Sequence, residues 1–168
     1  MLNFETRVAV ESDAQAISTL IIAGSSDGTG VEGSQDELDE WRLTNAAIPL
    51  ILRRIAEDTA VLLVAQLAPI DGQVGLFGTG YVSFGPDRDA YIGGVYCSVR
   101  GQGVGRRITE QLIEIARERG VNSVEMTIAR RNEAMRGLAL RLHFVQEDEF
   151  TEDRFYRTGF FGRWFLRT

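Results

Sequence analysis

The chain has 168 residues, of which 44% are hydrophobic, and this is enough for a sizeable core in a single domain spanning residues 1–168. Its formal net charge is −6, and residues 24–40 hold six acidic side chains and no basic one, which disfavours nucleic acid as a partner. Because no apolar stretch approaches the roughly 18 residues of a membrane span and the lone Cys97 allows no internal disulfide, we expect a cytoplasmic protein with no membrane partner.

The N-terminal segment is predicted to form a strand followed by a helix. Residues 4–10 have the composition of a strand, and the helix is predicted over residues 13–24. Ser12 and Gln15 have the spacing of a capping box, so we expect Ser12 to cap this helix.

The next region combines acidic residues with glycines and then becomes helical. We predict that residues 24–40 form a solvated acidic loop and helix face, and the alternative is a site for a small cationic ligand. A second helix is predicted from Gln35 toward Ala56. Because proline removes a backbone donor, this helix is expected to bend or break at Pro49.

Three strands are predicted in the middle of the chain. Residues 59–68, 75–85 and 90–99 have strand composition, and turn residues separate them at 71–72 and 86–87. Strands joined by such short turns run in opposite directions, so we expect an antiparallel meander.

A crossover and a hairpin are predicted to complete the sheet. Hydrophobic residues recur at helical spacing over 104–115, and the strand predicted at 122–129 should pair in parallel with the strand before this helix. Asn132 can cap another helix, and strands are expected around 144–150 and 159–167. The predicted fold class is therefore α+β, with a mixed, mostly antiparallel sheet, one parallel crossover and helices on both faces.

The segment "RGQGVGRR" at residues 100–107 places three glycines and three arginines where a helix begins. The first amides of a helix have no partner within it, and with the helix dipole they form an anion site that glycines leave open. A phosphate group is the expected ligand, and the alternative is a tight turn with surface arginines. A P-loop needs a lysine at Arg106, and the dinucleotide motif GxGxxG needs a glycine there, so both are disfavoured.

From "YIGGVYCSVRGQGVGRRITEQLIEIA" onward the chain resembles the GCN5-related N-acetyltransferase (GNAT) superfamily. Residues 100–105 match its acetyl-CoA signature Arg/Gln-x-x-Gly-x-Gly/Ala, and Asn132 and Phe144 stand where the family has an asparagine and an aromatic residue. The resemblance implies a GNAT-like acyl-CoA N-acyltransferase fold. It also implies acetyl transfer from the cosubstrate acetyl-CoA to a primary amine of a small molecule or peptide, by direct attack in a ternary complex. The alternative is a CoA-binding sensing or regulatory module of the same fold with little turnover.

The resemblance also assigns residues to the cosubstrate. The pyrophosphate of CoA would lie on backbone amides from Gln102 to Arg106, and Asn132 would contact the pantetheine arm. Backbone near Val95 and Cys97 would pair with that arm, and an amide near Val95 would stabilise the oxyanion. No metal is expected. The expected binding residues are Val95, Cys97, Arg100, Gly101, Gln102, Gly103, Val104, Gly105, Arg106 and Asn132.

The chain departs from the family at the proton donor. Ala139 stands where the family often has a tyrosine that protonates the leaving thiolate, and His143 stands where a glycine is expected. Two other donors are therefore considered: His143, one helical turn beyond Ala139, and Tyr96 in the strand before the loop. The alternatives are a histidine that ends a helix and a tyrosine that serves in packing.

The general base and the role of the cysteine are also open. The strand at 90–99 lacks the glutamate that the family often uses as a base, which leaves Glu32 and Glu37 as candidates. Cys97 takes the place of a proline in the family's V-x-P-x-x-R-G spacing, and a two-residue deletion in the turn is an alternative alignment. Acylation of Cys97 in a ping-pong reaction is conceivable, but a small buried residue is the favoured interpretation.

The acceptor and the C-terminal segment complete the sequence-based predictions. Residues equivalent to 22–45 shape the acceptor pocket of the family, and their acidity here would suit a cationic amine. Residues 153–168 interleave arginines with aromatic side chains. We predict that these aromatics fill the core or a homodimer contact rather than stack on RNA.

Overall fold

The computed structural model describes residues 3–25, 34–67, 75–151 and 160–168, although side chains are described only up to residue 147 and from residue 162. Within these ranges, no helix is both long and apolar enough to cross a membrane. The elements in chain order are β1 (Phe4–Val8), a 3-10 turn η1 (Glu11–Asp13), α1 (Ala14–Ser25), α2 (Gln35–Asn45), α3 (Ile48–Ala56), β2 (Ala60–Leu67), β3 (Leu76–Phe84), β4 (Asp89–Cys97), α4 (Val104–Glu118), β5 (Ser123–Ala129), α5 (Glu133–Arg141), β6 (Val145–Thr151) and β7 (Phe160–Arg167).

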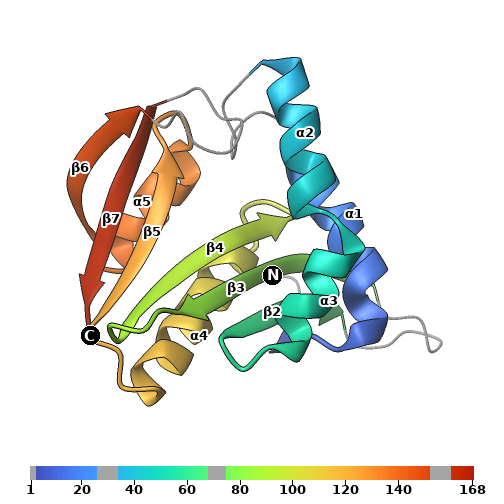
Figure 1. Ribbon diagram of the computed structural model, residues 1–168, viewed down its shortest axis with the longest axis horizontal. Coiled ribbons are helices and arrows are strands. Elements are labelled where there is room, and N and C mark those ends of the chain that lie inside the picture. Colours follow the sequence, from blue (N-terminus) through green and yellow to red (C-terminus); the bar gives the residue numbers. More distant parts are fainter. Residues whose placement is uncertain (1–2, 26–33, 68–74, 152–159) are drawn as a thin grey trace.

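These strands form one seven-stranded sheet with the order β1-β2-β3-β4-β5-β7-β6 (Figure 1). Neighbouring strands are antiparallel except β4 and β5, which are parallel and connected by α4. The predicted meander, the single parallel crossover and the terminal hairpin are therefore confirmed. The hairpin folds back so that β7, and not β6, lies beside β5.

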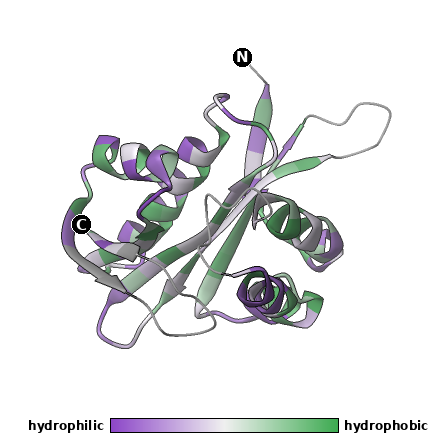
Figure 2. Cartoon of the chain, turned by 90° about the horizontal axis from the view of Figure 1, so that it is seen from above, coloured by the Kyte–Doolittle hydropathy of each residue, from purple (hydrophilic) through white to green (hydrophobic). Residues whose placement is uncertain are grey.

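Helices cover both faces of the sheet, and each face has its own hydrophobic core. Residues of α1, α2 and α3 fill one core, and residues of α4 and α5 fill the other (Figure 1). Successive side chains of a strand point to opposite faces. Thus Leu62 and Val64 of β2 enter the first core, whereas Leu63 and Ala65 enter the second. The helices on both faces combine hydrophobic and hydrophilic residues, as Figure 2 shows, which is expected of helices that pack on a sheet.

Helix α4 lies unusually close to β3 because two glycines of that strand face it. A Cβ atom on Gly78 would lie 2.6 Å from Cγ1 of Val104, and one on Gly80 would lie 2.8 Å from Cγ2 of Ile108. Both side chains of α4 are fully buried. Their packing fixes the N-terminal end of α4 beside the β3–β4 pair, and this end is where the glycine segment lies.

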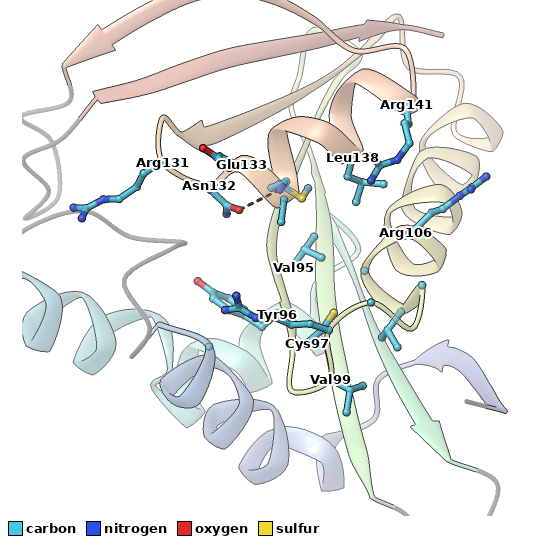
Figure 3. A pocket seen from close by; sticks show the side chains of 18 residues that line it. Val95, Tyr96, Cys97, Val99, Arg106, Arg131, Asn132, Glu133, Leu138 and Arg141 are labelled. Carbon is cyan, nitrogen blue, oxygen red and sulfur yellow. Dashed lines mark hydrogen bonds between the residues drawn. The ribbon is translucent and has the colours of Figure 1, made fainter. Parts of the chain in front are cut away.

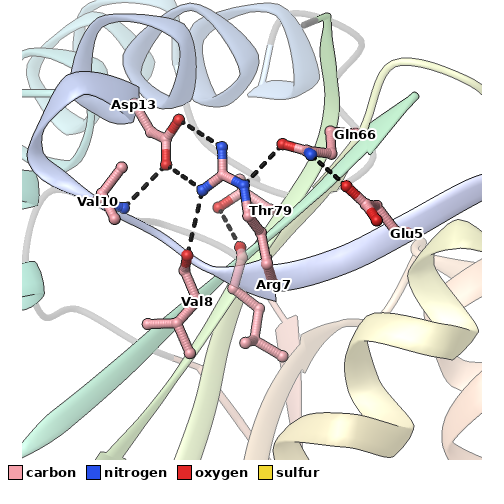
Figure 4. Close-up of polar contacts among 8 residues, drawn as sticks. Glu5, Arg7, Val8, Val10, Asp13, Gln66 and Thr79 are labelled. Atoms are coloured by element: carbon pink, nitrogen blue, oxygen red, sulfur yellow. Dashed lines mark hydrogen bonds and ion pairs between the residues drawn. The ribbon is translucent and has the colours of Figure 1, made fainter. Parts of the chain in front are cut away.

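The start of α1 differs from the predicted capping box. Helical structure begins with the turn η1 at Glu11, and it is Asp13 that accepts a hydrogen bond from the Val10 amide at 2.9 Å. The same carboxylate accepts two bonds from the Arg7 guanidinium, at 2.6 and 2.9 Å (Figure 4). The box predicted for Ser12 and Gln15 is therefore wrong, because a charged partner on β1 selects Asp13 as the capping side chain.

The second predicted helix is divided rather than bent. Helix α2 ends at Asn45 and α3 begins at Ile48, with Pro49 in its first turn. Proline is well tolerated at this place because the amides of the first turn have no intrahelical acceptor. The break turns α3 back onto the sheet beside α1 and β2, so one predicted helix supplies two walls of the first core.

The aromatic C-terminal segment contributes to the second core. Trp164 is 3% exposed and packs with Leu166 in the core on the α4 side of the sheet. The prediction that the aromatic side chains of this segment fill the core is confirmed for Trp164. Residues 153–159 lie outside the described residues.

Candidate functional site

The parallel strands β4 and β5 separate soon after they pair. Their register joins Asp89 with Ser123, Ala90 with Val124 and Tyr91 with Glu125. Beyond these pairs, β4 continues to Cys97 and β5 to Ala129 without further pairing between them. The two strands thus form a fork that opens toward the ends of β4 and β5, where α4 and α5 begin.

A β-bulge interrupts β4 inside this fork. Tyr81 pairs with Gly93 and Thr79 pairs with Tyr96, so β4 has one residue more than β3 between these positions. Gly94 takes the left-handed conformation there, with φ of +59°. A bulge leaves its extra residue out of the ladder and re-aims the neighbouring backbone. Gly94 and Val95 of β4 therefore lie opposite the single residue Gly80 of β3, at the point where the fork opens.

The glycine segment supplies an open helix N-terminus beside the fork. Gly103 is the N-cap of α4, with φ of +82°, and its carbonyl accepts the first helical bond from the Arg107 amide. The amides of residues 104–106 consequently have no acceptor inside the helix. A Cβ atom on Gly101 or Gly103 would meet no atom of the described residues within 4 Å, so none of them fills the space beside these two glycines.

A cavity of about 700 Å³ connects the fork with this helix end (Figure 3). All the binding residues predicted from the sequence line it except Gln102, and Tyr96 lines it as well. The residues that sequence reasoning missed come mainly from α5 and the turn before it. They are Gly24, Val99, Arg131, Glu133, Ala134, Met135, Leu138 and Arg141. The positions 134, 138 and 141 share one helical face, and this spacing could have indicated from the sequence that they line one cavity.

The charge of the cavity favours an anionic ligand. Four arginines and one glutamate line it, and the arginines are Arg100, Arg106, Arg131 and Arg141. The Arg106 guanidinium lies 2.7 Å from Glu110 on the next helical turn, and Arg106 also lines the cavity. Guanidinium groups and helix N-terminal amides both suit phosphate oxygens. A long ligand with a phosphorylated end therefore fits the residues of this cavity.

Asn132 has a structural role that limits what else it can do. Its side-chain oxygen accepts a hydrogen bond from the Met135 amide at 3.1 Å and caps α5, as the sequence predicts. The side chain also lines the cavity. Because the oxygen serves the cap, the amide NH2 group is the part that is suited to a ligand acceptor.

A second, smaller cavity of about 100 Å³ lies beside the bulge, on the side of the sheet that α1, α2 and α3 cover. Its lining is mostly aromatic and aliphatic, with a few polar side chains. The lining residues are Ile17, Ile21, Trp41, Asn45, Ile51, Arg54, Leu62, Thr79, Tyr81, Tyr91, Gly93, Gly94, Tyr96 and Thr127.

Tyr96 is the residue that lines both cavities. Its ring packs against Gly24 of α1, where a Cβ atom would lie 2.5 Å from Cδ1, and lies 6.2 Å from the Trp41 ring between centroids. These contacts fix the ring between helices and bulge. Tyr96 is thus held where a group in the large cavity meets a group in the small one.

Cys97 is poorly suited to nucleophilic catalysis. Burial raises the pKa of its thiol to about 11, so the thiolate needed for attack is scarce near neutral pH. Its Sγ atom lies 3.5 Å from the place of a Cβ on Gly105, which is an ordinary packing distance. These observations favour the interpretation of Cys97 as a small packed residue.

His143 does not lie on the helix face that its spacing suggested. Helix α5 ends at Arg141, and His143 takes a left-handed conformation just beyond it, with φ of +66°. Its side chain is exposed and does not line the large cavity, while Ala139 is completely buried in the core. The structure therefore places His143 at a helix-ending position, where glycine is usual.

Neither of the two predicted general bases is found at the site among the described residues. Glu37 accepts a bond from the Ser34 amide at 2.6 Å and forms the capping box of α2. It lines neither cavity. Glu32 lies outside the described residues. The described acidic residues of α2 are otherwise mostly exposed, which agrees with a solvated acidic face.

Comparison with known proteins gives one family and many similar folds. A model of the acetyltransferase (GNAT) family matches residues 31–144. PaiA N-acetyltransferase from Thermoplasma acidophilum, in complex with coenzyme A, is 14% identical over 99% of this chain and 100% of that chain, with a TM-score of 0.79. Ribosomal-protein-alanine N-acetyltransferase from Brucella melitensis is 22% identical over 98% and 99%, with a TM-score of 0.75.

A polyamine enzyme has the same fold. Spermidine N-acetyltransferase from Vibrio cholerae, in complex with CoA and spermine, is 17% identical over 98% of this chain and 95% of that chain, with a TM-score of 0.72. No curated protein matches the sequence. At these identities the likeness establishes the fold, and the acceptors of the similar enzymes differ from one another.

Proposed function

Because the chain belongs to the acetyltransferase (GNAT) family, which uses acetyl-CoA as its cosubstrate, we propose that it transfers an acetyl group from acetyl-CoA to a primary amine. The observation that carries this proposal is the pair of cavities that meet at Tyr96 and the bulge of β4. One cavity suits a long phosphorylated ligand, and the other suits a small acceptor group.

The large cavity accounts for the binding of the cosubstrate. The amides of residues 104–106 and the lining arginines hold the pyrophosphate, and the fork between β4 and β5 receives the pantetheine arm. Backbone groups near Val95 and Cys97 pair with this arm, and the NH2 group of Asn132 contacts it. Binding through backbone amides keeps the thioester beside the bulge.

The bulge and Tyr96 account for the reaction itself. The neutral amine attacks the thioester carbonyl carbon while the backbone amide at Val95 donates to the oxygen that becomes negatively charged. The C–S bond then breaks, the amine loses a proton to solvent, and the Tyr96 hydroxyl protonates the leaving thiolate. The tyrosinate then regains a proton from solvent. Direct attack is supported by the protonated state of Cys97, which disfavours an acyl-cysteine intermediate.

Release of free CoA thiol in the presence of candidate amines tests the proposal. We expect acetyl-CoA to raise the melting temperature and thiol release to depend on the amine, with little release when no amine is added. Stabilisation without release on any amine would instead favour a CoA-binding sensing module. A protein that acetyl-CoA does not stabilise at saturation contradicts both functions. Cytoplasmic location, the single-domain boundary and homodimer formation stay predictions.

A further inference from the structure

The small cavity contains one feature that the sequence did not predict, an arginine among aromatic side chains. Among the described residues that line this cavity, Arg54 of α3 is the one charged residue. Its guanidinium carbon lies 4.1 Å from the centroid of the Tyr81 ring. Stacking on a ring orients a guanidinium but leaves its charge uncompensated.

No carboxylate neutralises Arg54 within the described part of the chain. The ion pairs of its neighbours show the contrast, since Arg53 lies 3.5 Å from Glu57 and Arg42 lies 2.7 Å from Asp39. A half-buried cation among aromatic groups attracts an anion more strongly than a solvated one does. The acceptor cavity therefore presents positive charge, which opposes the cationic acceptor expected from the acidity of residues 24–40.

The Tyr81 side chain contacts both Arg54 and the bulge of β4. A Cβ atom on Gly93 would lie 2.7 Å from the Tyr81 hydroxyl, and one on Gly94 would lie 3.0 Å from the ring carbons Cδ1 and Cε1. Tyr81 thus contacts the bulge directly while Arg54 stacks on its face. An anion at Arg54 and an amine at the bulge are close enough to belong to one small molecule.

The size of the cavity points the same way. A volume of about 100 Å³ is well below the roughly 300–1,000 Å³ of most ligand sites. A compact group fits there more readily than a long polyamine. Arg54 can bind a carboxylate through two parallel hydrogen bonds, which also fixes the direction of the amine.

We propose that the acceptor is an amine that carries a carboxylate, such as an amino acid, and that Arg54 binds this carboxylate. The inference rests on the proposed acetyl transfer and specifies its acceptor. Arg54 then determines specificity: it contacts the acceptor, holds the amine toward the thioester and disfavours amines whose remaining groups are cationic.

Matched pairs of amines test this directly. The two compounds of each pair differ only by the carboxylate, and the pairs are L-alanine with ethylamine and L-phenylalanine with 2-phenylethylamine. Spermidine serves as an amine whose remaining groups are cationic. We expect kcat/KM to be about 10- to 100-fold higher for the amino acid of at least one pair, and lowest for spermidine. Arg54→Gln should abolish this preference while leaving kcat/KM for the matched amine within about threefold.

Arg53→Gln is the control variant. Arg53 shares the last turn of α3 with Arg54, so both substitutions change the charge near the end of the helix equally. Arg53 is 66% exposed in its side chain, pairs with Glu57 and does not line the small cavity. We expect Arg53→Gln to keep the preference for the carboxylate.

The outcomes separate this proposal from the proposed function. The role of Arg54 is overturned if thiol release is equal within each pair, or if Arg54→Gln leaves the preference for the carboxylate unchanged. Either result leaves the proposed acetyl transfer intact. If no amine gives thiol release, titration of the CoA complex with N-acetyl-L-alanine and N-ethylacetamide decides. Tighter binding of the carboxylated product, lost in Arg54→Gln, supports the proposal, and equal or undetectable binding overturns it.

Discussion

The two cavities that meet at Tyr96 are built in different ways. The large one is lined almost entirely by two stretches, residues 95–106 and residues 131–141, and much of its chemistry resides in backbone amides and glycines. The small one draws side chains from seven elements, from α1 to β5. A ligand site made of contiguous backbone can be recognised from a sequence motif, whereas one made of distant side chains requires the fold.

The strongest way to break the large cavity alone is Gly103→Glu. A carboxylate at the N-terminus of α4 would occupy the place that we propose for the pyrophosphate and would repel it. We expect CoA affinity to fall more than about 100-fold. The left-handed conformation at this position adds about 1–2 kcal/mol of destabilisation, so the variant should still fold. Calorimetric titration with CoA measures the loss.

Gly120→Glu is the matched control for this variant. Gly120 follows the other end of α4, has φ of +69° and is surrounded by equally open space. The same strain and charge are therefore introduced about one helix length away. CoA affinity close to that of the unmodified protein is expected, and equal losses in both variants would contradict the assignment of the pyrophosphate to residues 104–106.

Tyr96→Phe tests the boundary between the cavities. Removing the hydroxyl should lower kcat about 30- to 100-fold, near the lower end of general-acid effects because a thiolate leaves comparatively well. The KM for acetyl-CoA should change little. Tyr91→Phe is the control, since Tyr91 lines the small cavity but not the large one. We expect steady-state kinetics to show kcat within about threefold for this variant, and a kcat that survives in Tyr96→Phe would exclude the tyrosine as proton donor.

Asp13→Asn weakens the support of the small cavity without touching either lining. The Arg7 guanidinium holds the pKa of Asp13 below its ordinary value of 3.8, and the pair anchors α1, which supplies Ile17 and Ile21 to that cavity. We expect the free energy of unfolding at pH 7 to fall by about 2 kcal/mol.

The pH dependence of unfolding sharpens this prediction. A carboxyl group with a lowered folded-state pKa stabilises the protein above its ordinary value, and this contribution is lost as the pH falls below about 4. Urea denaturation at pH 7 and at pH 3 should therefore show a smaller difference in the variant than in the unmodified protein. An identical difference in both would remove Asp13 from the acid-sensitive groups.

The smallest effect is expected from His143→Gly, which lies outside both cavities. Glycine adopts φ of +66° without the steric cost that histidine pays, so the variant should be about 1 kcal/mol more stable. Thermal unfolding measures the gain, and kcat should stay unchanged. A loss of activity would restore His143 as a candidate proton donor.

The sequence predicted the elements of the large cavity because each has a local cause. Asn132 caps α5, the glycines of 101–105 leave the start of α4 open, and the short turns dictate a meander. The capping box at Ser12 was wrong because Arg7, on another element, engages Asp13. Local spacing does not include such a partner.

The acceptor cavity could not be predicted for the same reason. In the sequence, Arg54 is simply one of two adjacent arginines in a predicted helix. It reaches Tyr81 because the helix breaks between α2 and α3 and α3 packs on the sheet. The bulge at Gly94 depends on the register between β3 and β4, which spacing alone does not set. Net acidity suggested a cationic acceptor, whereas the lining residues present an arginine.

Amide chemical-shift mapping of the 15N-labelled protein during titration with CoA is the most direct test of whether the large cavity binds the cosubstrate. We expect the largest shifts at the amides of residues 101–106 and at Val95, with Gly120 and the amides of β1 unaffected. Shifts centred on α1 to α3, with residues 101–106 unchanged, would contradict the assignment of the cosubstrate to the cavity between the fork and α4.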